Sequence, residues 1–495
     1  MDMLIGLVLV AITFDLLLYF KLFWQFRYVL LIFSTAFLLA AFSIATGYFD
    51  LLYAAILGLV FFFRLIAIAR VYKNRLHQAH LKQVSQQSLL ALNLTLLVVV
   101  LLGSYVAITV LSAVVELLVA LQAGFSIMLF AFVTNSIVQT RYHGNLHHYS
   151  DKELPTLTVA IPARNETDDL KECIDTILSS DYPKLEVLVL DDCSQGKKPP
   201  SIIKHHAHAG VRFLQGTPPP DNWLAKNHAY QQLADEATGD YILFCGVDVR
   251  MSTTYLRNII THIKYKKKRM LSVLPVRYHA AIFSSFVQPM RYWWELALPR
   301  KFLNKPAVLS TCWVIQKKVL QRLGGFHAVK KSIVPERYFA RECVSHDSYS
   351  FLRANEELDL HTTKKLIDQV QTAYRVRYPQ FRSRIESVLL YISVLTLVFI
   401  LPYVFAIGAW LIGNEFLFAL SLISIIFLTV SHVLIVTVSQ PSNSLMAIIN
   451  LPFVVLSEIS LTTYSMLQYE FGEVIWKGRN ICLPILSENY DAVAD

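Results

Sequence analysis

Long apolar runs lie at both ends of this chain, and a mixed apolar and polar pattern fills the middle. The long runs occur before about residue 140 and after about residue 385. In the middle, short apolar runs alternate with segments whose apolar residues recur at helical spacing. Runs of the first kind are typical of membrane spans, and the alternation is typical of a parallel sheet with crossover helices. The pattern predicts an α/β domain inserted between two groups of membrane helices.

The amino-terminal third contains five candidate spans, at residues 3–20, 28–45, 51–69, 90–112 and 117–138. Loops 21–27 and 70–82 and the region after Arg141 are basic, whereas the loops at 47–50 and near Glu116 carry no Lys or Arg. Cytoplasmic loops are enriched in Lys and Arg. We therefore expect a multi-pass membrane protein, in the plasma membrane, with its amino terminus outside and its middle domain in the cytoplasm.

The carboxy-terminal region predicts two spans, at 388–412 and 416–438. A third apolar run, 445–456, is short for a span and gives way to polar residues. A single crossing there would put the tail outside, whereas a re-entrant or interfacial helix would keep it in the cytoplasm. The predicted divisions are a five-helix membrane region (1–140), a cytosolic domain (141–385), and two or three membrane helices with a basic tail (386–495).

Composition supports this division. The chain is 55% hydrophobic, and its mean hydropathy is +0.45. The formal net charge of +9 comes mostly from the middle domain. Anionic lipid headgroups beside that domain explain this charge, and so does a phosphate-rich substrate. Nucleic acid is not an expected partner because no nucleic-acid-binding motif is present, and the six cysteines form no CxxC pair that would indicate zinc or redox chemistry.

Charged residues follow three short apolar runs of the middle domain. The first run is followed by Arg164 and Glu166, the second by Asp191 and Asp192, and the third by Asp248. Ligands of parallel sheets bind beyond the carboxyl ends of the strands. Carboxylates there suit hydrogen bonding to a nucleotide, or holding Mg²⁺ or Mn²⁺ against phosphate. Neither a P-loop nor a GxGxxG fingerprint is present.

Two aromatic and basic stretches are predicted to lie at the membrane surface. Residues 286–303 include Trp293 and Trp294, and residues 367–390 include Arg377 and Tyr378. Aromatic and basic side chains together are typical of helices at headgroup level. For the first stretch, an ordinary core helix remains the alternative.

The middle domain resembles family 2 glycosyltransferases of the GT-A fold, over roughly residues 156–378. Five segments carry the resemblance: IPARNE (161–166), VLDD (189–192), DNWLAKNHA (221–229), ATGDYILFCGVDV (237–249) and LGGFHAVKKSIVPERYFAR (323–341). The resemblance implies a Rossmann-like mixed α/β sheet and inverting sugar transfer from a nucleotide-diphosphate sugar. A UDP-sugar is the expected donor, with Mg²⁺ or Mn²⁺ as cofactor.

The same resemblance implies roles for individual residues. Glu336 is the expected catalytic base, and Asp248 the expected metal ligand. The expected donor-binding residues are Pro162, Ala163, Arg164, Glu166, Asp191, Asp192, Lys226, Asp248 and Arg377. Trp293, Trp294 and Tyr378 are expected on the acceptor side.

Three family motifs are altered in this sequence. The DxD motif reads Gly246-Val247-Asp248, the Glu-Asp pair at the base reads Pro335-Glu336, and QxxRW ends in Arg377-Tyr378. Loss of one carboxylate weakens a metal site without abolishing it, since Mg²⁺ commonly keeps several waters and uses substrate phosphate. A Glu in place of Asp can take the same proton if the backbone accommodates one more methylene.

The tail WKGR (476–479) resembles the end of membrane glycosyltransferases that modify lipids such as hopanoids, carotenoids and ceramide. This implies that the acceptor is a hydroxyl of a membrane lipid, and that the tail is cytoplasmic if it reaches the site. A basic segment that only anchors at headgroups is the alternative for the tail. For the whole chain, the alternatives are a processive polysaccharide synthase and a catalytically weak, nucleotide-binding membrane scaffold.

Overall fold

The computed structural model describes most of the chain beyond residue 110. The described residues are 2–17, 27–48, 58, 111–144, 147–166, 168–195, 206–220, 222–278, 281–287, 289–297, 306–471, 474–476 and 479–480. The expected spans at 51–69 and 90–112 lie outside these ranges, apart from residues 58 and 111–112.

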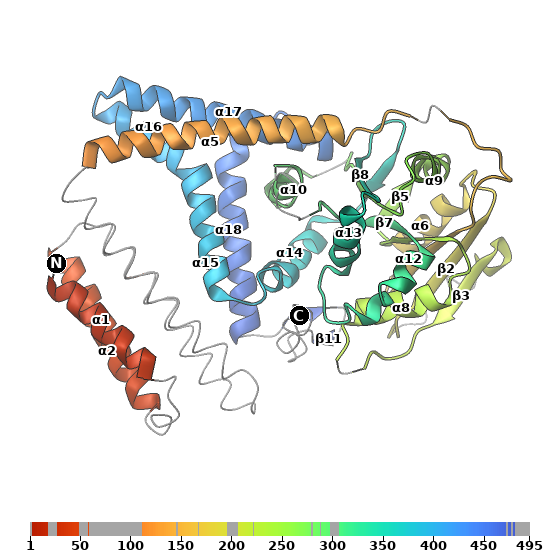
Figure 1. The fold of residues 1–495 in the computed structure, drawn as a ribbon, viewed down its shortest axis with the longest axis horizontal. Helices are drawn as coiled ribbons and strands as arrows, with labels where there is room; N and C mark the ends of the chain where they lie inside the picture. Colours follow the sequence, from red (N-terminus) through yellow and green to blue (C-terminus); the bar gives the residue numbers. More distant parts are fainter. Residues whose placement is uncertain are drawn as a thin grey trace.

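A seven-stranded mixed sheet forms the centre of the middle domain (Figure 1). In spatial order its strands are β3 (Val211–Gln215), β2 (Leu185–Asp191), β1 (Leu157–Ala163), β4 (Tyr241–Cys245), β7 (Cys312–Gln316), β6 (Met270–Leu274) and β8 (Tyr349–Arg353). Strands β3, β2, β1 and β4 pair in parallel, whereas β7 is antiparallel to both β4 and β6. The mixed α/β sheet predicted from the sequence is therefore confirmed.

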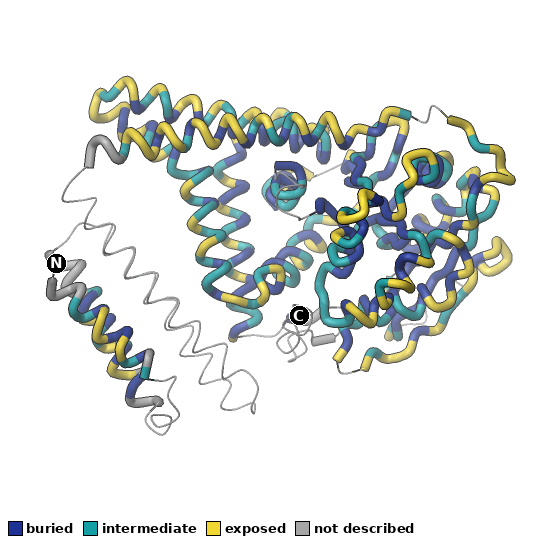
Figure 2. The backbone as a smooth tube through the Cα atoms, in the orientation of Figure 1, coloured by how far each residue is buried: buried dark blue, intermediate teal, exposed yellow. Residues whose placement is uncertain are grey.

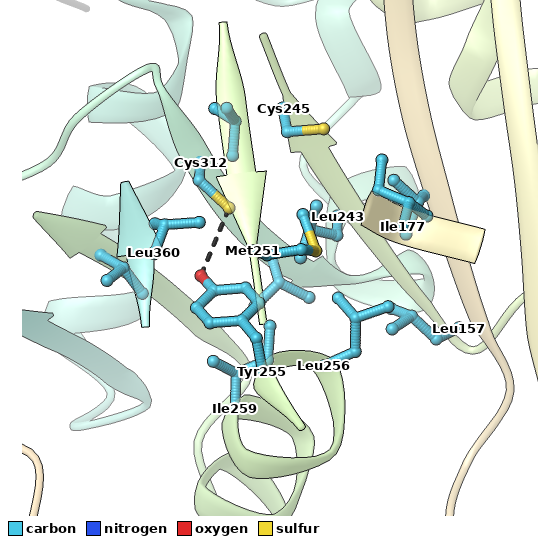
Figure 3. Close-up of a cluster of buried hydrophobic side chains, with 14 of the residues drawn as sticks. Leu157, Ile177, Leu243, Cys245, Met251, Tyr255, Leu256, Ile259, Cys312 and Leu360 are labelled. Carbon is cyan, nitrogen blue, oxygen red and sulfur yellow. Dashed lines mark hydrogen bonds between the residues drawn. The ribbon is translucent and has the colours of Figure 1, made fainter. Parts of the chain in front are cut away.

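Helices cover both faces of this sheet. On one face, α6 (Asp168–Leu178) and α9 (Tyr255–Tyr265) bury their apolar stripes, and Tyr255 reaches the Sγ of Cys312 at 3.4 Å (Figure 3). The other face carries α8 (Ala225–Glu236), α12 (Lys317–Arg322), η4 (Gly325–His327) and α13 (Pro335–Ser345). The strands are buried on both sides because they lie between these two helical layers (Figure 2).

Shorter elements connect these layers to the rest of the chain. They are the 3-10 helices η2 (His206–Ala209), η3 (Ile282–Phe286) and η6 (Pro441–Asn443), and the ladders β5 (Val249–Met251) with β9 (Leu360–Thr362) and β10 (Ile475–Trp476) with β11 (Arg479–Asn480). The β5–β9 ladder pairs Val249 with Thr362. This register brings the chain after β9 beside Asp248.

Among the remaining described helices, α10 (Pro289–Ala297) lies between β6 and β7 in sequence, and the others flank the sheet domain on both sides. The others are α1 (Asp2–Leu17), α2 (Arg27–Tyr48), α5 (Leu111–Gln139), α14 (Leu366–Gln380), α15 (Ile385–Leu395), the π-helical turn η5 (Thr396–Ile400), α16 (Leu401–Leu411), α17 (Glu415–Ser439) and α18 (Ala447–Phe471). Four helical stretches are long and apolar enough to cross a membrane: 115–139, 385–411, 415–439 and 447–471.

Helix α18 is longer than the apolar run at 445–456. It continues to Phe471 through polar residues, which include Glu458, Thr462 and Ser465. These three side chains are buried against the protein. The helix continues because its polar positions face neighbouring elements, which the hydropathy of one segment does not reveal.

Candidate active site

The carboxyl ends of β1, β2 and β4 meet at one rim of the sheet. The register aligns Ala163 at the end of β1 with Asp191 at the end of β2. Both Asp191 and Asp192 are buried, and an Asp191 carboxylate oxygen accepts a hydrogen bond from the Ser194 backbone at 3.3 Å. The structure thus brings Pro162, Ala163 and the two aspartates together, as the sequence predicted.

The loop after β1 is held to the loop after β2. The Arg164 guanidinium donates to the carbonyl oxygens of Asp192 at 2.6 Å and Cys193 at 2.5 Å. Asn165 adopts a positive φ of 52°, which Asn tolerates better than most residues, and its side chain accepts from the Gln195 backbone at 2.9 Å. Arg164 therefore shapes the rim through backbone carbonyls. Glu166 is half-buried in the same loop.

Asp248 is fixed by the chain that follows β9. The Thr362 hydroxyl donates to an Asp248 carboxylate oxygen at 3.2 Å, and the Thr363 backbone donates to the Asp248 carbonyl at 2.9 Å. A Cβ atom at Gly246 would lie 2.6 Å from the other Asp248 carboxylate oxygen. The missing first carboxylate of the DxD motif therefore leaves room that the Asp248 side chain occupies.

The first turns of α8 and α13 carry Lys226 and Glu336. The Asn227 amide donates to the carbonyls of Val329, Lys330 and Ser332 at 2.9, 3.2 and 2.7 Å, which ties α8 to the loop before α13. Glu336 is 1% exposed, and its Oε2 has no hydrogen-bond partner among the described residues. Burying a carboxylate oxygen without a hydrogen-bond partner costs folding free energy. The presence of such an oxygen at Glu336 therefore points to a functional role.

Lys226 links these groups electrostatically. Burial lowers the pKa of Lys226 below its usual value, the Glu336 and Asp248 charges oppose this, and the Arg375 and Arg291 charges add to it. The side chains of α8, α13, α14 and the β4 end therefore act on one another in a single site. Glu336, Lys226 and Asp248 were predicted from the sequence to work together.

Three further cations face this site and were not predicted. Burial lowers the pKa of Lys364 to about 8 and that of Arg375 to about 10. It also lowers the pKa of Arg277, whose Nε and Nη1 have no partner among the described residues. The Asp248 charge acts on both Lys364 and Arg277. Their position in the sequence is the one feature that could have indicated Arg277 and Lys364, since each follows closely on a short strand.

Arg377 and Tyr378 contact α18 in this structure. The Arg377 guanidinium pairs with the Glu458 carboxylate at 2.7 Å, and both side chains are buried. Tyr378 is fully buried, and its hydroxyl lies 2.6 Å from a Glu470 carboxylate oxygen. The donor role of Arg377 and the acceptor role of Tyr378 stay predictions, and the observed contacts are with another helix.

Trp293 and Trp294 fasten α10 to the apolar helices. The Trp293 indole donates to Nδ1 of His432 on α17 at 3.0 Å, and the Trp294 indole donates to the Tyr391 hydroxyl on α15 at 2.9 Å. Trp293 is fully buried, and α10 is enclosed by α5, α17 and α18 (Figure 1). Trp293 thus has the environment of a core helix, while the acceptor-side role of both residues stays a prediction.

A separate basic hollow of about 520 Å³ lies away from this site. Its lining includes Lys264, Lys267, Lys268, Arg269, Lys318 and Arg322. Tyr241, the first residue of β4, also lines it, so it opens at the amino end of the strand whose other end leads to Asp248. It is therefore not the candidate active site.

Comparisons with known proteins agree with the sequence resemblance. Residues 158–324 match the model of the family described as glycosyl transferase family 2. This match begins in β1 and extends past α12, so it includes Asp191, Lys226 and Asp248. No curated protein matches the chain.

Several solved structures are similar at low identity. A mannosyltransferase from Pyrobaculum calidifontis in complex with GDP-Man and Mn²⁺ is 14% identical, with 72% of this chain and 98% of that chain covered and a TM-score of 0.43. TarS 1–349 of S. aureus with UDP-GlcNAc is 14% identical, covering 66% and 95%, with a TM-score of 0.33. Glucosyl-3-phosphoglycerate synthase from Mycobacterium tuberculosis, with Mn²⁺, UDP and glucosyl-3-phosphoglycerate, is 14% identical, covering 47% and 82%, with a TM-score of 0.31.

The similarity to this family rests on the sequence match, and the mixed sheet with its acidic rim is consistent with it. Over residues 158–324, the chain is therefore similar to glycosyl transferase family 2.

Proposed function

We propose that this protein transfers a sugar, with inversion, from a nucleotide-diphosphate sugar to a hydroxyl of a membrane lipid. UDP is the proposed nucleotide, and the catalytic domain is proposed to lie in the cytoplasm. The observation that carries the proposal is the Glu336 carboxylate, which is buried, has an oxygen without a partner among the described residues, and acts on Lys226. This is the environment expected of a catalytic base whose free oxygen would accept a hydrogen bond from a substrate hydroxyl.

The donor is proposed to bind across the rim of the sheet. Base and ribose would contact Asp191, Asp192 and Glu166, which follow β2 and β1 as in other nucleotide-binding α/β domains. The diphosphate would lie among Lys226, Arg277, Lys364 and Arg375. Burial lowers the pKa of each of these cations, so they are partly desolvated. The negative charge of a diphosphate would stabilise their charged forms.

Asp248 is the residue proposed to hold a divalent cation. No group of three His, Cys, Asp or Glu side chains suited to a metal occurs among the described residues. The single carboxylate still fits Mg²⁺ or Mn²⁺, because such ions keep waters and take substrate phosphate oxygens as ligands. When bound, the ion would offset the negative charge that develops on the leaving diphosphate.

Glu336 is proposed to complete the reaction as the base. It would accept the proton of the acceptor hydroxyl while that oxygen bonds to the anomeric carbon and the bond from carbon to diphosphate oxygen breaks. One displacement of this kind inverts the anomeric centre. A lipid is the proposed acceptor because α10 connects the domain to α15 and α17, two helices within candidate spans.

Asp248 and Glu336 together test the assignment. We expect Asp248→Ala to lower UDP release from UDP-sugars by about 100-fold or more, because several kcal/mol of charge stabilisation would be lost. The assay uses purified protein in nanodiscs with a total lipid extract and a Mg²⁺ or Mn²⁺ titration. Asp235→Ala, an exposed carboxylate on α8, is the control. Wild-type rates in both Asp248→Ala and Glu336→Gln would end the proposal.

Lys364 gives the donor site a pH dependence. Its amine is charged below its pKa of about 8 and loses its charge as the pH rises through that value. We expect the affinity for UDP to fall by up to about tenfold per pH unit above 8, as the attraction of this cation for the diphosphate is lost. Lys364→Met should remove this step, and Lys365→Met, an exposed neighbour, should keep it. Titration calorimetry with UDP from pH 7 to 9 measures the effect.

A processive polysaccharide synthase is the second candidate, since the same fold and membrane helices could serve it. Product length distinguishes the two. A single added sugar on an extracted lipid supports the proposed function, and a ladder of long products on a gel supports the synthase.

A further inference from the structure

We propose that α18 lies along the membrane surface as an interfacial helix and does not cross the bilayer. Its apolar face would rest in the lipid, and the tail after it would stay on the side of the catalytic domain. Length and composition alone make α18 a candidate span. The proposal rests on its contacts, and it does not depend on the proposed reaction.

Both ends of α18 are hydrogen-bonded to the middle domain. Near its start, the Asn450 amide donates to the Ser285 hydroxyl of η3 at 3.1 Å. Near its end, Ser465 accepts from the Tyr378 backbone of α14 at 3.0 Å, and Glu470 lies 2.6 Å from the Tyr378 hydroxyl. A helix that crossed the bilayer would hold these two ends on opposite sides.

The contacts at the two ends of α18 are separated by about the thickness of the hydrocarbon core of a bilayer. Asn450 and Glu470 are 20 residues apart, or about 30 Å along a helix at 1.5 Å per residue, which equals the hydrocarbon core. Between them, Glu458 pairs with Arg377 of α14 at 2.7 Å. The middle domain therefore follows α18 along this whole length.

Helix α14 sets the depth of α18, because the two lie side by side. The Gln369 amide near the start of α14 donates to Ser284 of η3 at 3.1 Å, close to the Asn450 contact, and Tyr378 near its end meets Ser465. Helix α14 begins directly after Lys364 of the candidate site and carries Asp368, Arg375 and Arg377. Such a helix belongs at the surface of the membrane, so its neighbour does too.

The side chains of α18 divide into two faces that suit this position. The face toward the protein carries the buried polar residues Asn450, Glu458, Thr462, Ser465 and Glu470. Apolar side chains are exposed elsewhere along the helix, and they include Ile449 (67% exposed), Phe453 (60%), Leu456 (50%) and Phe471 (45%). The exposed Ile282 and Phe283 of η3 add to this apolar surface. An exposed apolar surface of this kind fits a lipid layer.

Helices α5 and α17 are taken to give the direction of the bilayer, and α15 runs alongside α18 (Figure 1). Helices α5 and α17 lie along each other, whereas α18 runs across them (Figure 1). His432 of α17 bonds to Asn450 at 2.9 Å, so α18 starts next to α17. If α5 and α17 cross the membrane, α18 lies in its plane.

Spin labels measure the depth of the helix directly. Single cysteines replace Ile449, Leu456 and Phe471 in the full chain, with Cys193 and Cys482 changed to Ser, while the four buried cysteines remain. In nanodiscs of phosphatidylcholine and phosphatidylglycerol, we expect similar shallow depths at all three positions. The matched control is α17, where Phe416→Cys, Ile426→Cys and Val430→Cys should report changing depths. Depths on α18 that pass through the bilayer centre would overturn the proposal.

Epitope tags provide a second measurement that needs no substitution in α18. One tag follows Asp495, one is inserted after Gly413 between α16 and α17, and one follows Lys266 in the middle domain. We expect antibody to reach the tag after Asp495 and the middle-domain tag from the same side of the membrane. The tag after Gly413 should be reached from the other side. A tail tag that shares the side of Gly413 would overturn the proposal.

Discussion

Replacing Glu336 by Gln will lower sugar transfer by about 100- to 10,000-fold, the range that a positioned acid or base contributes. Gln has nearly the same shape and keeps the first turn of α13, but its amide cannot accept the proton of an acceptor hydroxyl. The side chain is 1% exposed and one of its oxygens has no partner among the described residues, so the substitution breaks no observed hydrogen bond at that atom. The measurement is single-turnover transfer to an extracted lipid at saturating donor.

The control for Glu336 stands on the same helix. Glu342→Gln removes a half-buried carboxylate of α13 that makes no observed contact with the site, and we expect a nearly wild-type rate. UDP affinity separates a chemical role from a binding role. It should change little in Glu336→Gln, except that the pKa of Lys226 falls further when the Glu336 charge that raises it is removed. Full transfer activity in Glu336→Gln would rule out this residue as the base.

The acidic half of the candidate site could be predicted from local sequence. Strands β1 and β2 with the helix between them form a single βαβ unit, and the parallel register places Ala163 and Asp191 side by side. The ends of such strands meet because of the topology alone, so no knowledge of distant contacts was needed. Asp248 follows from the same reasoning, since β4 is the other neighbour of β1.

The cationic half could not be predicted in the same way. Lys364 and Arg375 lie more than 100 residues after Asp248, and they reach the site because β9 pairs with β5 and then leads into α14. Antiparallel pairing of two three-residue strands leaves almost no signal in the sequence. The family motif instead directed attention to Arg377, two residues beyond Arg375 on the same helix.

The polar positions of α18 were misleading for a related reason. Glu458 and Thr462 look like the end of a membrane segment when the segment is read by itself. In the structure they are buried, and Glu458 meets Arg377 from a helix about 80 residues earlier. A hydropathy value describes the transfer of a single side chain from water to an apolar environment. It cannot report that a charged residue is buried beside an opposite charge from a distant segment.

Arg377→Met will destabilise the protein by about 3–5 kcal/mol, the cost of leaving one partner of a buried ion pair without the other. The Arg377 guanidinium is 2.7 Å from Glu458, whose second oxygen accepts from the Tyr391 hydroxyl at 3.2 Å. Without the guanidinium, the Glu458 carboxylate is left buried between α14, α15 and α18 without its cationic partner. Thermal unfolding in nanodiscs, followed by the loss of helical signal, measures the change.

The double variant decides what Arg377 does. Arg377→Met combined with Glu458→Gln should recover most of the lost stability, because a neutral amide does not leave a buried charge unpaired. Lys365→Met, an exposed site before α14, is the control and should unfold like the wild type. If Arg377 instead binds the donor, Arg377→Met would keep its unfolding temperature and weaken UDP binding, and Glu458→Gln would not restore that affinity. The observed pairing favours the first outcome, since the Arg377 guanidinium would have to break its ion pair with Glu458 to reach a diphosphate.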